Sequence, residues 1–300
     1  MEQALYACRF VQFTATMLLF GSSAFRFYAL RGDISIAEFD DWFRPVALVL
    51  SILTLLSALA LLLFQSAAMA GAPVAALDPA TVSAVLFETR FGQVWRWHLL
   101  FSVILVFACP VRSRKRQSFI LILSLLTLAT LAWTGHAAMA EGAARIIHGL
   151  NQSAHLLAAG LWLGGLAPLA WLLLWARAAQ DDAGVRRTRD AVDYFSQMGY
   201  AAVTVIALTG SVNTLLLVGN FGALLGTPYG RLLTVKLVLF LAMVVVALWN
   251  RIRLAPWIDH DPLVLAALRR NVRLEQFLGL CILAIVSILG TWPPATTGGQ

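Results

Sequence analysis

Charged residues are scarce in this sequence. Only 12% of the 300 residues are Asp, Glu, Lys or Arg, whereas about 25% is usual for a soluble globular domain. Hydrophobic residues make up 60% of the chain, and the mean hydropathy is +0.80. So few charges cannot coat a water-exposed surface, and several apolar runs approach the roughly 20 residues that cross a bilayer as a helix. We therefore predict an all-α polytopic integral membrane protein.

Cysteine pairs and nucleotide-binding motifs are also missing. The three cysteines, Cys8, Cys109 and Cys281, are far apart and form no CxxC pair, which argues against a disulfide framework or a zinc site. The sequence has no GxxxxGK[ST] or HExxH motif, and its 15 acidic residues lie mostly in loops, so a paired-carboxylate centre is not expected. These absences predict no catalytic residues and a protein that is not an enzyme.

Eight apolar segments can be drawn along the chain, separated by stretches rich in proline or charge. We expect one transmembrane domain over residues 1–300, embedded in the lipid bilayer. Its eight helices should lie at about 4–30, 45–70, 93–111, 118–139, 150–176, 194–219, 231–250 and 274–292.

The net charge of +7 reflects topology and does not indicate nucleic-acid binding, because no basic patch alternates with exposed aromatic residues. Arginines and lysines concentrate in the loops after residues 111, 176 and 250. The positive-inside rule places these loops in the cytoplasm, so both termini should lie in the periplasm of a bacterial inner membrane. The segment 31–44, expected as a cytoplasmic loop, is the exception, since its four acidic residues outnumber Arg31 and Arg44. Trp95 and other tryptophans near helix ends are expected at the membrane interfaces.

The five histidines are sorted by this topology. His98, His136, His148 and His155 map to the outer side, and His260 maps to a cytoplasmic loop. Polar residues inside membrane helices are costly and usually functional. A single histidine at a helix end, such as His98, is nevertheless more often a hydrogen-bonded structural residue than a ligand.

Spacing along one helix favours a metal site. His148 and His155 are seven residues apart, which places them on nearly the same helix face, with Asn151 between them. His136 would approach from the preceding helix across a short outer loop. Imidazole suits copper, zinc, iron or nickel, and thioether suits Cu(I). The predicted ligands are therefore His136, His148 and His155, with His98, Met139 and Glu141 as weaker candidates.

Other polar or small residues inside the apolar segments are expected to support this site. The paired glycines Gly164 and Gly165, beside Trp162, allow close helix approach and are interpreted as a packing notch. Lys236 either extends to the outer surface or balances a polar cavity. Glu275 is expected to pair with a nearby basic residue.

Several short motifs together resemble the bacterial copper resistance protein D family. The motifs are Gly135-His136, Glu141-Gly142, Ile147-His148, Asn151, His155-Leu156-Leu157, Trp162-Leu163-Gly164-Gly165-Leu166, Thr227-Pro228-Tyr229-Gly230, Lys236 and Leu274-Glu275. The resemblance covers most of the last five predicted helices and is weaker over the first three. It implies copper handling at the inner membrane, with a small periplasmic copper-binding protein of the copper resistance protein C type as partner. By position, His136, His148, His155 and Asn151 match the family motif.

Three functions remain open at this stage. The first is a copper transporter that captures the ion at the outer histidines and imports it to the cytoplasm. The second is a haem-binding electron-transfer protein, because histidines on neighbouring helices can ligate haem; however, His148 and His155 on one helix cannot grip opposite haem faces. The third is a copper sensor or assembly factor without transport. The oxidation state of the copper is not determined by the sequence.

Overall fold

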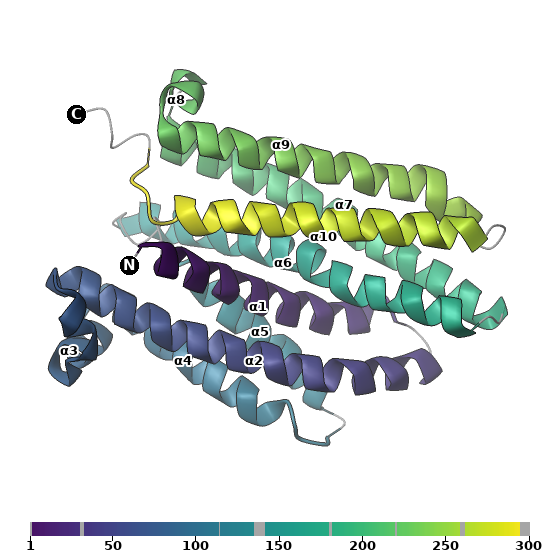
Figure 1. The fold of residues 1–300 in the computed structure, drawn as a ribbon, viewed down its shortest axis with the longest axis horizontal. Helices are drawn as coiled ribbons and strands as arrows, with labels where there is room; N and C mark the ends of the chain where they lie inside the picture. Colours follow the sequence, from purple (N-terminus) through teal and green to yellow (C-terminus); the bar gives the residue numbers. More distant parts are fainter. Residues whose placement is uncertain are drawn as a thin grey trace.

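The computed structural model of the chain describes residues 2–30, 33–113, 115–134, 142–179, 182–219, 221–258 and 262–294. Within these ranges the ordered elements are helices, and the long ones run side by side in one bundle (Figure 1). The N-terminal end of the first helix and the C-terminal end of the last lie at the same end of the bundle (Figure 1). The predicted all-α membrane bundle is confirmed.

Each of the eight predicted apolar segments overlaps one long helix, although several helices begin about 8–12 residues before the predicted start. The helices are α1 (Glu2–Tyr28), α2 (Asp33–Ala70), α4 (Arg90–Ala108), α5 (Arg116–Leu131), α6 (Gly142–Ala179), α7 (Asp182–Val218), α9 (Pro228–Trp249) and α10 (Pro262–Leu289). Among the described residues, seven of them are long and apolar enough to cross a membrane. The exception is α5, whose 16 residues rise about 24 Å, less than the roughly 30 Å of a hydrocarbon core.

Helix α2 corrects the prediction of a loop over residues 31–44. The helix starts at Asp33, and its first turns are amphipathic. Phe39 and Phe43, four residues apart, are fully buried, whereas Asp41 between them is exposed. The helix dipole favours an acidic residue in the first turn, so Asp33, one of the charges that suggested a loop, suits the start of this helix.

Two gaps between predicted helices contain short helices that the sequence reading missed. Between α2 and α4 lie the 3-10 helix η1 (Pro73–Leu77) and α3 (Pro79–Glu88), and α8 (Phe221–Gly226) precedes α9. Proline at the first helical position starts a helix because its missing N–H would be unpaired there. Asp78 caps α3 by accepting from the backbone N–H groups of Ala80 and Thr81. Hydrogen bonds from Thr81 hold the pKa of the Asp78 carboxyl below its ordinary value.

Glycines bring α1 and α6 into close contact at the centre of the bundle. A Cβ atom added to Gly164 would overlap the backbone carbonyl of Met17, and one added to Gly21 would overlap that of Gly160. Ser22 Oγ also donates a hydrogen bond to the Gly164 carbonyl at 3.3 Å. Small residues spaced four apart, as Gly160 and Gly164 are, allow this approach where lipid supplies no hydrophobic drive. The crossing fixes the position of α6, which carries His148 and His155.

Basic residues gather at the end of the bundle opposite the termini. The ends of α4, α6 and α9, and the starts of α5, α7 and α10, all lie there (Figure 1). These connections carry the arginine-rich sequences from which the topology was predicted. The described part of the chain is therefore arranged as the positive-inside rule requires if this end faces the cytoplasm.

Candidate metal site

His155 is held by the neighbouring helix α7. Its Nδ1 atom lies 2.8 Å from Thr209 Oγ1, and Thr209 Oγ1 itself donates to the backbone carbonyl of Val205 at 2.5 Å. Since the hydroxyl proton is used in that bond, Thr209 Oγ1 accepts from His155, and Nδ1 carries the ring proton. The other ring nitrogen, Nε2, is then unprotonated and has no hydrogen-bond partner among the described residues.

The same helix face carries an amide network. Asn151 Nδ2 donates to the Thr209 carbonyl at 3.1 Å and to Asn213 Oδ1 at 2.9 Å. Asn213 Nδ2 in turn donates to Gln152 Oε1 at 2.8 Å. The stripe predicted from the spacing of Asn151 and His155 therefore faces α7. Asn151 and His155 thus both bond to Thr209, and the His155 ring cannot rotate without breaking its own bond to the Thr209 hydroxyl.

A lysine and a glycine complete the surroundings of His155. Lys236 on α9 is partly buried and lies within electrostatic range of the His155 ring. Gly210 leaves room beside the ring, because a Cβ atom there would lie 3.4 Å from His155 Cε1.

The remaining predicted ligands fall into two groups. His148 lies on α6, is partly buried, and sits about 10 Å nearer the terminal end of the bundle than His155, from the 1.5 Å rise per residue. His136, Met139, Glu141 and the loop residue His260 lie outside the described residues. Among the residues that are described, no three His, Cys, Asp or Glu side chains gather closely enough to hold a metal ion. A site with three such protein ligands would thus need at least one residue outside the described ranges, where His136 and Glu141 lie.

His98 has a different environment. The ring is fully buried, its Nε2 lies 2.8 Å from Gln12 Nε2, and its Nδ1 lies 2.7 Å from Thr130 Oγ1. Thr130 donates its own proton to the Thr127 carbonyl, so His98 donates from Nδ1 and accepts the Gln12 amide proton at Nε2. Both ring nitrogens are therefore occupied, and metal ligation by His98 would require Gln12 to move.

Ser57 and Trp95 also contact this network and hold it in place. Gln12 Oε1 accepts from Ser57 Oγ at 2.5 Å. The Trp95 ring stacks on His98 with centroids 4.5 Å apart and planes 11° apart, and its Nε1 donates to the Ala58 carbonyl. Trp95 is only 2% exposed, so its ring packs inside the bundle and does not face the surroundings of the protein. Its neighbour Trp97 is exposed, because helix geometry places residues two apart on different faces.

A second buried polar network involves Glu275 on α10. Asn250 Nδ2 donates to Glu275 Oε1 at 2.8 Å. Asn271 Nδ2 donates to Asn250 Oδ1 at 2.7 Å. Glu275 is 3% exposed. Its partner is the amide of Asn250, which corrects the expectation that Glu275 pairs with a basic residue. The signal that sequence reading passed over is Asn250, an amide at the end of a long apolar segment.

The backbone changes from α-helical to π-helical geometry at Asn250. The segment Asn250–Leu254 forms a π-helical turn directly after α9, and such turns are frequent at functional sites. The wider turn accompanies the inward position of the Asn250 side chain, which is 7% exposed. Asn250, Asn271 and Glu275 thus join the π-helical turn to α10 through hydrogen bonds inside an apolar bundle.

The fold and its polar interior define a multi-pass helical membrane protein. Two family models match the chain: residues 1–146 match the N-terminal domain of copper resistance protein D-like proteins, and residues 189–289 match copper resistance protein D. Together they extend the resemblance to the first helices, where the motifs alone are weaker.

Three relatives agree with this match. Inner membrane protein YebZ of Escherichia coli (strain K12) is 29% identical over 302 residues, covering 96% of this chain and 97% of the relative. Copper resistance protein D of Pseudomonas syringae pv. tomato is 30% identical over 304 residues, covering 98% of each. Copper transport protein CutJ of Bacillus subtilis (strain 168) is 32% identical over 177 residues, covering 57% of this chain and 32% of the relative. The chain belongs to the copper resistance protein D family.

Proposed function

We propose that this protein handles copper at the bacterial inner membrane, binding the ion on the periplasmic side and passing it to the cytoplasm. Support comes from the family, from relatives named for copper resistance and copper transport, and from the relative named as an inner membrane protein. The bundle contributes seven helices of spanning length among its described residues.

The observation that carries the proposal is the state of His155. Its Nδ1–H is held by Thr209 Oγ1, which leaves the Nε2 lone pair for a metal. Metal-ligating histidines usually donate the other ring N–H to a neighbouring acceptor, which fixes the tautomer and the ring orientation. His98, whose two nitrogens are both occupied, lacks this property and is assigned to positioning the helices.

We place His136 with His155 as direct ligands, with Met139 and Glu141 as lesser candidates from the same segment. His148, about two helical turns closer to the outer end by the α-helix rise, would act as an earlier contact for the incoming ion. Asn151 would act through Thr209 and Asn213, which it contacts. A periplasmic copper-binding protein of the copper resistance protein C type is the proposed donor of the ion.

Copper titration of purified variants tests the binding site. His136→Ala and His155→Ala should each abolish most copper binding, and His148→Ala should weaken it. His260→Ala is the matched control, since the sequence places His260 in a cytoplasmic loop. Wild-type affinity in folded His136→Ala and His155→Ala proteins would refute the proposed site.

Transport needs a separate measurement. Proteoliposomes that contain the purified protein should accumulate copper, and the His155→Ala protein should not. Copper binding without flux would refute transport and favour a sensor or assembly factor.

A further inference from the structure

A strongly basic cavity opens at the end of the bundle opposite the termini. It has a volume of about 480 Å³ and is lined by Arg26, Asp40, Arg44, Arg112, Ser113, Arg116 and Gln117. Four helical segments contribute to it: the end of α1, the first turns of α2, the turn after α4 and the start of α5. Four arginines against one aspartate give this lining an excess of three positive charges. The cavity is far from His155 and plays no part in the proposed copper site.

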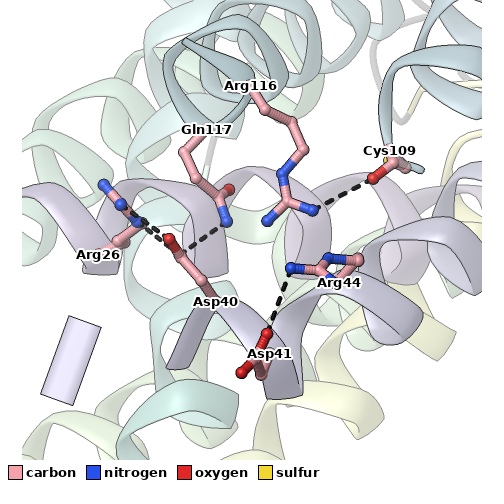
Figure 2. Close-up of polar contacts among 7 residues, drawn as sticks. All are labelled: Arg26, Asp40, Asp41, Arg44, Cys109, Arg116 and Gln117. Carbon is pink, nitrogen blue, oxygen red and sulfur yellow. Dashed lines mark hydrogen bonds and ion pairs between the residues drawn. The ribbon is translucent and has the colours of Figure 1, made fainter. Parts of the chain in front are cut away.

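The one aspartate of the lining is already fully used. Arg26 Nε and Nη2 donate to the two Asp40 oxygens at 2.6 and 2.9 Å, and Gln117 Nε2 donates to the same carboxylate at 2.8 Å (Figure 2). Asp40 therefore neutralises Arg26. This pair also explains how the acidic segment 31–44 is accommodated at the basic end of the protein.

Arg44 and Arg116 lack a comparable partner. Arg44 Nη2 contacts Asp41 at 3.2 Å, but Asp41 is 76% exposed, and an exposed ion pair contributes little. Arg44 Nε is buried without an acceptor among the described residues. Arg116 is 7% exposed and donates to the neutral Cys109 carbonyl at 3.3 Å. The two side chains lie close to each other (Figure 2), and both line the cavity, where like charges repel.

The start of α5 adds to the positive potential. Arg116 and Gln117 are its first residues and line the cavity, and the residue before them, Lys115, makes no side-chain capping bond. Unpaired backbone N–H groups at a helix N-terminus attract anions, phosphate groups in particular. Arg112, which is exposed, leaves one guanidinium accessible at the mouth of the cavity.

We infer that this cavity binds a phosphate group. Guanidinium groups match phosphate oxygens through paired hydrogen bonds, and an anion between Arg44 and Arg116 would give each of them a charged acceptor inside the cavity. Two sources share this chemistry: the headgroup of an anionic phospholipid and free inorganic phosphate. Basic pockets between membrane helices on the cytoplasmic side suit lipid headgroups.

Binding measurements on the purified full-length protein in neutral detergent test the inference. The probes are short-chain phosphatidylglycerol, inorganic phosphate and, as a neutral lipid, short-chain phosphatidylcholine. The variants are Arg116→Gln and Arg112→Gln; the second changes an exposed side chain and should leave the fold intact. Arg270→Gln is the matched control, because Arg270 is exposed on α10 at the same end of the bundle.

We expect wild-type protein to bind at least one of the two phosphate-bearing probes and not phosphatidylcholine. Arg116→Gln and Arg112→Gln should each raise the dissociation constant about tenfold, the loss expected for one charge-assisted hydrogen bond, and Arg270→Gln should not. Binding of phosphatidylglycerol alone identifies the lipid headgroup, and binding of inorganic phosphate identifies a site open to the free ion. Unchanged affinity in Arg112→Gln and folded Arg116→Gln, or an equal loss in Arg270→Gln, overturns the inference.

Discussion

The Nε2 atom of His98 lies 2.8 Å from the side-chain nitrogen of Gln12, and this bond joins two helices whose residues are 86 positions apart in sequence. Gln12 belongs to α1 and His98 to α4, while the other ring nitrogen reaches Thr130 at the end of α5. One imidazole thus connects three helices inside the bundle. A histidine with the same predicted depth as the metal ligands serves here as a structural junction.

Because His98 and Gln12 share a hydrogen bond, we expect substitution of either residue to cost a similar amount of stability. His98→Ala and Gln12→Ala should each lower the free energy of unfolding by about 1–3 kcal/mol per buried polar group left unpaired. Chemical unfolding in detergent micelles would measure the loss. If His98 were instead a copper ligand, His98→Ala would lose copper while Gln12→Ala kept it; equal copper binding in both folded variants is the expected result.

Thr209 offers a test of how His155 is oriented. Thr209→Val keeps the shape of the side chain but removes the acceptor of the Nδ1–H proton. Copper affinity should fall about 10–100-fold, the usual effect of losing a partner behind a metal ligand. Thr204→Val on the same helix is the control, because Thr204 is exposed and bonds only its own helix backbone. An unchanged dissociation constant for Thr209→Val would show that ring orientation does not matter.

Lys236 should oppose copper binding. Lys236 lies within electrostatic range of His155, and a positive charge there would repel a cation bound at the same ring. Lys236→Gln is therefore expected to bind copper several-fold more tightly in the same titration. Weaker binding by a folded Lys236→Gln protein would contradict this electrostatic account and point to a direct role for the lysine.

The α1–α6 crossing predicts opposite outcomes for two glycine substitutions. Gly164→Ala places a methyl group against the Met17 carbonyl and should lower the thermal midpoint. Gly199→Ala on α7 meets no atom within 4 Å and should leave the midpoint unchanged or raise it, since alanine favours a helix by about 1 kcal/mol over glycine. Equal stability of the two variants in thermal unfolding would mean that the helices can separate without cost.

The orientation can be measured by labelling single cysteines in spheroplasts, with the three native cysteines replaced by alanine. Ala72→Cys, at the end of the bundle that carries the termini, should react with a membrane-impermeant maleimide. Ser113→Cys, at the basic end, should react only after the membrane is opened. The reverse pattern would invert the proposed topology and place the outer histidines inside.

Much of the architecture follows from the sequence because its causes are local. Long apolar runs predict the eight major helices, and arginine-rich breaks predict which helix ends lie together. The observed helix boundaries differ from the predicted ones where one local pattern fits two structures. Acidic residues from Asp33 onward are typical of a loop but also of a helix start. Proline is typical of a loop too, yet Pro73 and Pro79 each start a short helix.

The roles of the polar side chains could not be read in the same way. Sequence spacing alone places Asn151 and His155 on one stripe, since helix periodicity is a property of neighbouring residues. Whether a histidine keeps a free lone pair depends on residues that approach from other helices: Thr209 leaves Nε2 of His155 free, whereas Gln12 occupies Nε2 of His98. The partners of Glu275 and the arginines around the basic cavity likewise come together only when distant helices pack. The sequence alone determined the membrane bundle and its family, because hydropathy, charge and motifs lie along the chain; tertiary packing decided which polar groups are satisfied, because their partners are distant in sequence.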